Sequence, residues 1–152
     1  MAADIRYVHT NLIARDWRRL VRFYVEVFDC RPTGPERDQA GEWLSAATGV
    51  AGAHLRGQHL LLPGHGDSGP TLEIYSYDGT AEQALPVANR AGYGHLAFHV
   101  ADVPAALDDV VAHGGQRLGE IAETTVPGVG PLQVTYARDP EGNIIELQHW
   151  GA

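Results

Sequence analysis

The sequence contains an approximate internal repeat. When His9 is aligned with His95, 86 residues further along, both segments begin with an alternating apolar–polar run. Both then pass through an aspartate, Asp16 or Asp102, into an apolar pattern with helical spacing. A carboxylate at that point is typical of a helix N-cap, because it accepts hydrogen bonds from free backbone N–H groups. The chain is therefore expected to fold as two similar modules.

Each half is expected to contain one strand, one helix and then three strands. The apolar spacing predicts one helix over residues 17–28 and a second that begins after Asp102 and is closed by Gly114 and Gly115. The first half is expected to contain, in addition, a short helical insert around residues 42–48. Residues 139–143 have the composition of a turn and predict a hairpin between the last two strands. The strands that follow each helix are expected at residues 30–36, 53–62, 70–77, 115–121, 131–138 and 143–150.

The length of 152 residues fits one domain. We interpret residues 1–152 as a single domain, with module one at about 4–78, a connector at about 79–91 and module two at about 92–150. A hydrophobic content of 44% is enough to form a core, which excludes disorder of the whole chain.

Charge and cysteine content exclude several classes of function. A formal net charge of −8 argues against nucleic acid or an anionic membrane surface as the main partner. Cys30 is the single cysteine, so neither an internal disulfide nor a cysteine zinc cluster can form, and a packed thiol is expected. The first residues lack the pattern of a secretion signal or membrane span, and we expect a cytoplasmic protein.

One histidine or glutamate occupies the polar face of each of four expected strands. Side chains alternate between the two faces of a strand, so His9 and His95 lie opposite the apolar residues of their strands. Glu73 and Glu146 each stand between two large aliphatic residues and face the other way. The order along the chain is His, Glu, His, Glu.

This set of side chains favours a metal site. A carboxylate shielded from water needs a partner, and two imidazoles with two carboxylates suit a divalent metal that keeps positions open for water or substrate. The alternative is that both glutamates lie on an open sheet face and both histidines are structural polar residues.

Several motifs resemble the vicinal oxygen chelate superfamily, the glyoxalase/bleomycin resistance/dioxygenase fold. They span Ile5 to Trp150 and comprise IRYVHTNLIARD with RFYVEVF, LEIYSY, GHLAFHVAD and DPEGNIIELQ. The resemblance implies an α+β fold in which paired βαβββ modules with curled mixed sheets enclose a metal-binding cavity. It also implies a small-molecule substrate and a homodimer, with no nucleic-acid or membrane partner.

The resemblance further implies that one divalent metal ion, Ni, Co, Zn or Mn, is bound by His9, Glu73, His95 and Glu146. This set is similar to that of glyoxalase I, in which the metal holds two adjacent substrate oxygens and a carboxylate moves a proton. Either Glu73 or Glu146 is then the catalytic base of a lyase, isomerase or epimerase reaction. The sequence does not distinguish between the two glutamates.

Two positions depart from the enzymes that use glutathione. Those enzymes usually have arginine four residues after the first ligand and asparagine four residues after the second, where this chain has Ile13 and Tyr77. Glutathione is therefore not expected as a substrate. Two alternatives stay open, an Fe(II) extradiol-type dioxygenase and a resistance protein that binds a small molecule or antibiotic.

The other histidines carry weaker expectations. His99 shares the face of His95 and is expected either to line the cavity or to be structural. The remaining five have no predicted partner and are expected in loops or at the surface: His54, His59, His65, His113 and His149. Residues 64–69 match GxGxxG but precede a strand, so a flexible loop is expected there and not a dinucleotide site.

Overall fold

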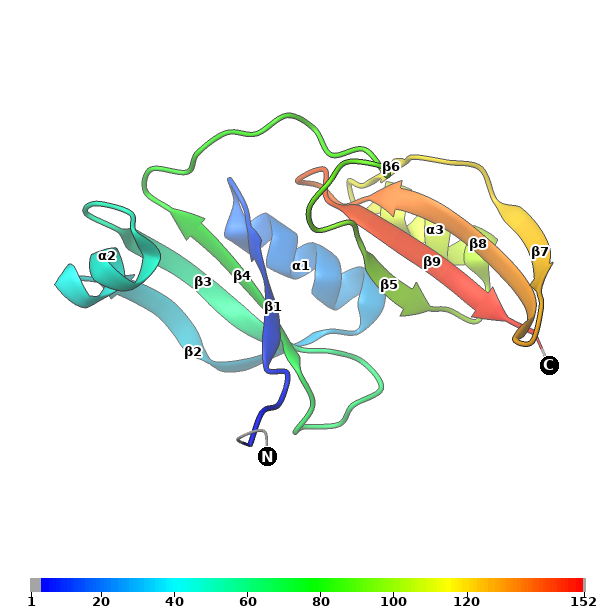
Figure 1. Cartoon of the computed structure of the whole chain (residues 1–152), viewed down its shortest axis with the longest axis horizontal. Helices are drawn as coiled ribbons and strands as arrows, with labels where there is room; N and C mark the ends of the chain where they lie inside the picture. The colour runs from blue at the N-terminus through cyan, green and yellow to red at the C-terminus, as the bar shows by residue number, and fades with distance from the viewer. Residues whose placement is uncertain (1–3, 152) are drawn as a thin grey trace. The chain divides into compact units, whose positions relative to one another are not determined.

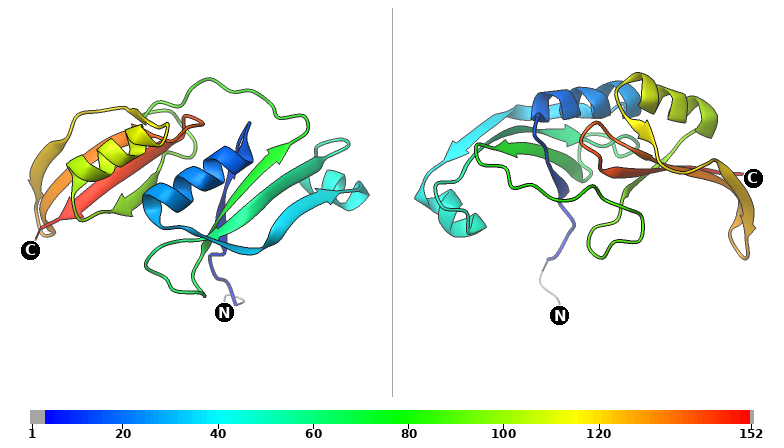
Figure 2. Two further views of the ribbon diagram at one scale, coloured as in Figure 1. Left: turned by 180° about the vertical axis from the view of Figure 1, so that it is seen from behind. Right: turned by 90° about the horizontal axis from the view of Figure 1, so that it is seen from above.

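The computed structural model describes residues 4–151. The chain divides into two compact units between Glu82 and Gln83. Each unit has one mixed sheet with a helix on one face (Figures 1 and 2). The predicted α+β class is therefore confirmed. Among the helices of residues 4–151, none is long and apolar enough to span a membrane.

The first unit has a four-stranded sheet in the order β1-β4-β3-β2. β1 pairs with β4 in parallel, and the other two pairs are antiparallel. The predicted helices over 17–28 and 42–48 are confirmed. The elements of this unit are β1 (His9–Ile13), α1 (Trp17–Phe28), β2 (Arg31–Ala40), α2 (Glu42–Thr48), β3 (His54–Leu61) and β4 (Thr71–Tyr77).

The second unit has a sheet in the order β5-β9-β8-β6, and β7 pairs with another part of β8. The predicted strand over 115–121 is wrong beyond its first residues. Leu118 and Gly119 both donate their N–H groups to the carbonyl of Tyr136, which ends the ladder. The elements are β5 (Leu96–His99), α3 (Val103–Ala112), β6 (Gln116–Arg117), β7 (Ala122–Val126), β8 (Gly130–Arg138) and β9 (Ile144–Trp150).

Aspartate side chains cap α1 and α3, as the repeat predicts. Asp16 accepts a hydrogen bond from the N–H of Arg19 at 3.0 Å. Asp102 accepts one from the N–H of Ala105 at 2.9 Å. Each cap satisfies a donor that the first helical turn leaves free.

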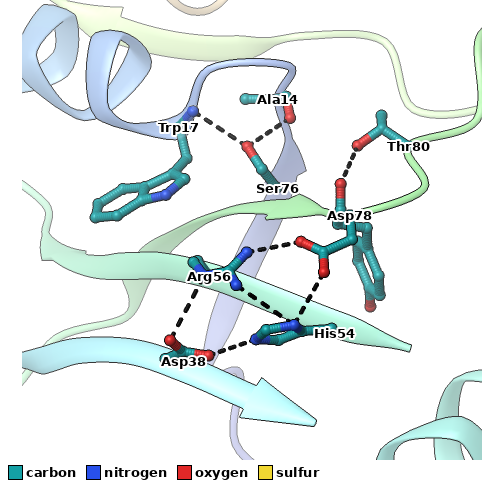
Figure 3. Close-up of polar contacts among 9 residues, drawn as sticks. Ala14, Trp17, Asp38, His54, Arg56, Ser76, Asp78 and Thr80 are labelled. Atoms are coloured by element: carbon teal, nitrogen blue, oxygen red, sulfur yellow. Dashed lines mark hydrogen bonds and ion pairs between the residues drawn. The ribbon is translucent and has the colours of Figure 1, made fainter. Parts of the chain in front are cut away.

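The start of α1 is fixed to β4 by one serine, as Figure 3 shows. Ser76 Oγ donates to the carbonyl of Ala14 at 2.7 Å and accepts from the N–H of Trp17 at 3.2 Å. Ser76 thus shares the helix-covered face of β4 with Leu72 and Ile74, both fully buried. Strand alternation then places Glu73 on the opposite face.

The second unit repeats this arrangement. Ile145 and Leu147 of β9 are fully buried, and α3 packs against β8 and β9. Glu146 lies between these two residues and faces the other side of the sheet. The apolar side of α3 is formed by Val103, Leu107 and Val110.

Candidate metal centre

The first histidine–glutamate pair is formed by β1 and β4. Asn11 lies opposite Glu73 in this parallel pair, and His9 is two residues earlier on the same face. His9 Nε2 is 3.6 Å from Glu73 Oε1. Asn11 donates from Nδ2 to the same oxygen at 2.9 Å. The structure therefore brings together the two metal-site residues predicted in the first unit.

A second histidine, His59, joins this pair from β3. His59 lies directly opposite Glu73 in the antiparallel pair of β3 and β4, and its Nε2 is 2.8 Å from Glu73 Oε2. The expectation that His59 has no partner and lies in a loop or at the surface was wrong. One ligand atom from each of His9, His59 and Glu73 lies within 4.8 Å of the other two.

Burial shapes the chemistry of this cluster. The Glu73 and His59 side chains are only 12% and 17% exposed. Burial lowers the pKa of His59, with Glu73 acting against that shift, so burial favours the neutral imidazole, the form that can bind a metal. The Tyr75 hydroxyl lies 3.0 Å from His59 Nε2. Burial, reinforced by Glu73, raises the pKa of Tyr75 and keeps its phenol protonated.

The second unit contains the other predicted pair. His95 Nε2 is 2.9 Å from Glu146 Oε2, and the Glu146 side chain is 15% exposed. Tyr136 lies opposite Glu146 in the pair of β8 and β9, and its hydroxyl donates to Glu146 Oε2 at 2.7 Å. This hydrogen bond, reinforced by partial burial, raises the pKa of Tyr136. Tyr136 is a contact that the sequence interpretation missed.

The donor chemistry of both pairs fits a divalent cation. At metal–ligand distances of about 2.1 Å, neighbouring ligands of an octahedron lie about 3 Å apart. Separations of 2.9 Å between His95 and Glu146 and 3.6 Å between His9 and Glu73 are close to that spacing. Each pair therefore offers one nitrogen and one oxygen to an ion. The site that joins all four residues stays a prediction.

The ring of His99 contacts another histidine. Its ring stacks on that of His149, with centroids 5.3 Å apart, and His149 Nδ1 is 2.8 Å from the carbonyl oxygen of Val100. The two expectations for His99, a place in the cavity lining or a structural role, stay predictions.

Figure 3 shows a separate polar cluster. It lies on the opposite face of the first sheet, because His54 and Arg56 alternate with His59 along β3. His54 Nε2 is 2.5 Å from Asp38, and its Nδ1 is 2.9 Å from Asp78. Arg56 also contacts both carboxylates. His54, which lies in β3, thus has charged partners in β2 and after β4 that the sequence did not predict. Since all four side chains are partly or largely exposed, we interpret this cluster as a surface ion-pair network.

Known proteins resemble nearly the whole chain. Residues 6–147 match the model of the Glyoxalase/Bleomycin resistance protein/Dioxygenase superfamily. A probable lactoylglutathione lyase from Vibrio parahaemolyticus is 28% identical over 144 residues, covering 93% of this chain and 88% of the relative. A 2-epi-5-epi-valiolone epimerase from an Actinomyces species is 31% identical over 145 residues, covering 91% and 76%. A glyoxalase family protein from Bacillus cereus has a TM-score of 0.83 at 19% identity, covering 99% of this chain and 97% of that one.

Proposed function

The chain belongs to the glyoxalase/bleomycin resistance protein/dioxygenase superfamily, and from this premise we propose that it is a divalent-metal-dependent enzyme of the glyoxalase type. It would act as a lyase, isomerase or epimerase on a small molecule that binds the metal through two adjacent oxygens. The observation that carries this proposal is the pairing of His9 with Glu73 and of His95 with Glu146. His9 begins β1, and His95 is the residue immediately before β5, the equivalent strand of the second unit.

In this proposal His9, Glu73, His95 and Glu146 together hold one Ni, Co, Zn or Mn ion. The bound cation would polarise the substrate oxygens and stabilise negative charge on them. Glu73 or Glu146 would take a proton from the carbon beside those oxygens and return it to the same or the neighbouring carbon. Both carboxylates are shielded enough for such a transfer to be protected from bulk water.

The curated relatives support proton-transfer chemistry. One is named as a lyase and the other as an epimerase. The chain has Ile13 and Tyr77 where glutathione-using enzymes usually have arginine and asparagine. We therefore propose a substrate other than a glutathione adduct.

Metal analysis of the purified protein tests the proposal. We expect about one divalent ion per chain after purification without chelator. His95→Ala and Glu146→Ala should each lose most of it, whereas His65→Ala, in the loop before β4, should keep it. A wild-type chain that holds no metal overturns the proposal. Full retention by either site variant removes that residue from the site.

One observation favours a second candidate. His9, His59 and Glu73 are two histidines and one carboxylate within a single unit, and this combination is typical of non-haem Fe(II) oxygenases. Oxygen consumption with added Fe(II) and a catechol would support a ring-cleaving dioxygenase. Turnover with another divalent metal and without oxygen uptake would contradict it.

We also propose a homodimer, as the family resemblance implies. Light scattering during size-exclusion chromatography should give twice the mass of one chain. A monomer at all concentrations tested would contradict this proposal.

A further inference from the structure

Each glutamate has a hydrogen-bond donor at the same position of its sheet. Glu73 lies opposite His59 on the neighbouring antiparallel strand, and Glu146 lies opposite Tyr136 in the corresponding place. The parallel neighbours match as well, because Asn11 faces Glu73 and Ala97 faces Glu146. Asn11 and Ala97 are separated by the same 86 residues as the repeat. His59 and Tyr136 are thus structurally equivalent.

The equivalent tyrosine indicates what this position does. The Tyr136 hydroxyl donates to Glu146 Oε2 at 2.7 Å, so the phenol supplies a hydrogen bond to the carboxylate. His59 Nε2 lies 2.8 Å from Glu73 Oε2, from the equivalent strand position. The two carboxylates differ in one respect, because His95 and Tyr136 contact the same oxygen of Glu146, whereas His9 and His59 lie at different oxygens of Glu73. A donor at this distance fixes the orientation of a carboxylate, as is usual for groups that support metal ligands.

The neighbours of the His59 ring favour the tautomer with the proton on Nε2. Nε2 lies 2.8 Å from a carboxylate oxygen, which only accepts, and 3.0 Å from the Tyr75 hydroxyl, which can accept or donate, so a proton on Nε2 suits the nearer contact. Nδ1 is 3.4 Å from Thr71 Oγ1, a hydroxyl that can donate to a bare ring nitrogen. In this tautomer Nε2 supplies a hydrogen bond to Glu73, as the phenol of Tyr136 does to Glu146.

The two oxygens of Glu73 then have separate partners. Oε2 is held by His59, while Oε1 points toward His9 and Asn11. An aligned Oε1 is the oxygen that would bind the ion beside His9 Nε2.

We propose that His59 is a positioning residue for Glu73, with the same role that Tyr136 has for Glu146, and that it is not itself a metal ligand. This inference rests on the proposed function, since it concerns the orientation of a ligand of the proposed ion. It also distinguishes the two candidate functions, because the two-histidine, one-carboxylate site requires His59 as a ligand.

Titration with Co²⁺, followed by its visible absorption, tests the proposal. His59→Leu removes the hydrogen bond and should weaken Co²⁺ binding about 10- to 100-fold, the usual effect of losing such a support. His59→Gln retains an N–H donor and should bind Co²⁺ nearly as the wild type does, with an unchanged spectrum. Tyr136→Phe is the matched variant in the second unit and should weaken binding in the same way as His59→Leu.

A second measurement uses the metal-free protein. The ring-nitrogen shifts of His59 in NMR spectra should show a proton on Nε2, and Glu73→Gln should change the Nε2 signal. A proton on Nδ1 alone overturns the inference. This readout does not depend on metal binding or on the folding of a leucine variant.

The remaining outcomes separate the two proposals. If the wild type binds no Co²⁺, the proposed function and this inference both fail. If the wild type binds Co²⁺ and His59→Leu binds it equally well, only the inference fails. If His59→Gln and His59→Leu lose binding equally and the spectrum changes, His59 is a ligand and the inference is overturned.

Discussion

Gly57 of β3 allows a close approach between two strands beside the candidate site. It lies opposite Tyr75 in the ladder of β3 and β4. A Cβ added at Gly57 would lie 2.0 Å from the carbonyl oxygen of Ile74 and 2.3 Å from Cδ1 of Tyr75. Both distances are far below van der Waals contact, and the nearer atom belongs to the backbone. Gly57→Ala therefore requires the strands to move apart or the Tyr75 ring to leave its place.

The size of the effect follows from these two clashes. Overpacking of a filled core costs about 1–3 kcal/mol, and the backbone clash places Gly57→Ala near the upper end. For a chain of this size, each kcal/mol lowers the melting temperature by about 2–4 °C. We therefore expect a loss of about 3 kcal/mol and a drop of about 6–12 °C.

Thermal unfolding followed by circular dichroism measures this drop. The matched control is Gly79→Ala, because a Cβ at Gly79 meets nothing within 4 Å, and it should melt close to the wild type. Gly57→Ala should also shift the NMR signals of the His59 ring, because Tyr75 is its neighbour. If Gly57→Ala melts with the control, the steric reasoning is refuted.

Three further predictions concern groups outside the site. Burial raises the pKa of Cys30 to about 12, so we expect a thiol reagent at about pH 8 to label only the unfolded chain; rapid labelling of native protein would contradict this. Hydrogen bonding to His54 and the charge of Arg56 lower the pKa of Asp38 below its ordinary value of 3.8. The stabilisation that the Asp38 carboxylate contributes should be complete above its ordinary pKa and should disappear as the pH falls through its lowered pKa. The difference in stability between the wild type and Asp38→Asn in urea unfolding should therefore shrink from about pH 6 to about pH 3. A constant advantage would be inconsistent with this network. Asp102→Ala should cost about 1 kcal/mol because the cap of α3 is lost, and Asp102→Ser should recover most of it; equal stability of all three chains would argue against the cap.

Local sequence patterns predicted the helices well and the strands less well. The helix over 17–28 follows from the apolar spacing of its own residues. Asp16 marks its start through a hydrogen bond to a residue only three positions further along the chain. The error over 115–121 has a long-range cause. Leu118 and Gly119 donate hydrogen bonds to the carbonyl of Tyr136 on β8. The apolar–polar alternation of residues 115–121 does not predict that contact.

The contact between His59 and Glu73 depends on the register between β3 and β4, which strand alternation alone does not predict. The sequence placed His59 in a strand and Glu73 in the next one, but their contact requires the register between those strands. Residues 62–70 form a long connection, which does not fix a register as a two-residue hairpin does. The register is set by packing, as where Leu60 pairs with Leu72 and both are buried beneath α1. Testing each register for a polar partner of Glu73 would have identified His59.

The parallel pairing in each unit explains how distant residues form a site. A parallel pair needs a long crossover connection, so the strand that carries the histidine and the strand that carries the glutamate are necessarily far apart in sequence. In each unit the crossover places a helix on one face, and the polar pair occupies the other. The crossover of the first unit is longer and includes α2, yet Asn11 and Ala97 still face their glutamates. The length of the crossover can therefore vary without changing which residue of the parallel strand faces the glutamate, and the histidine stands two residues before that position in each unit.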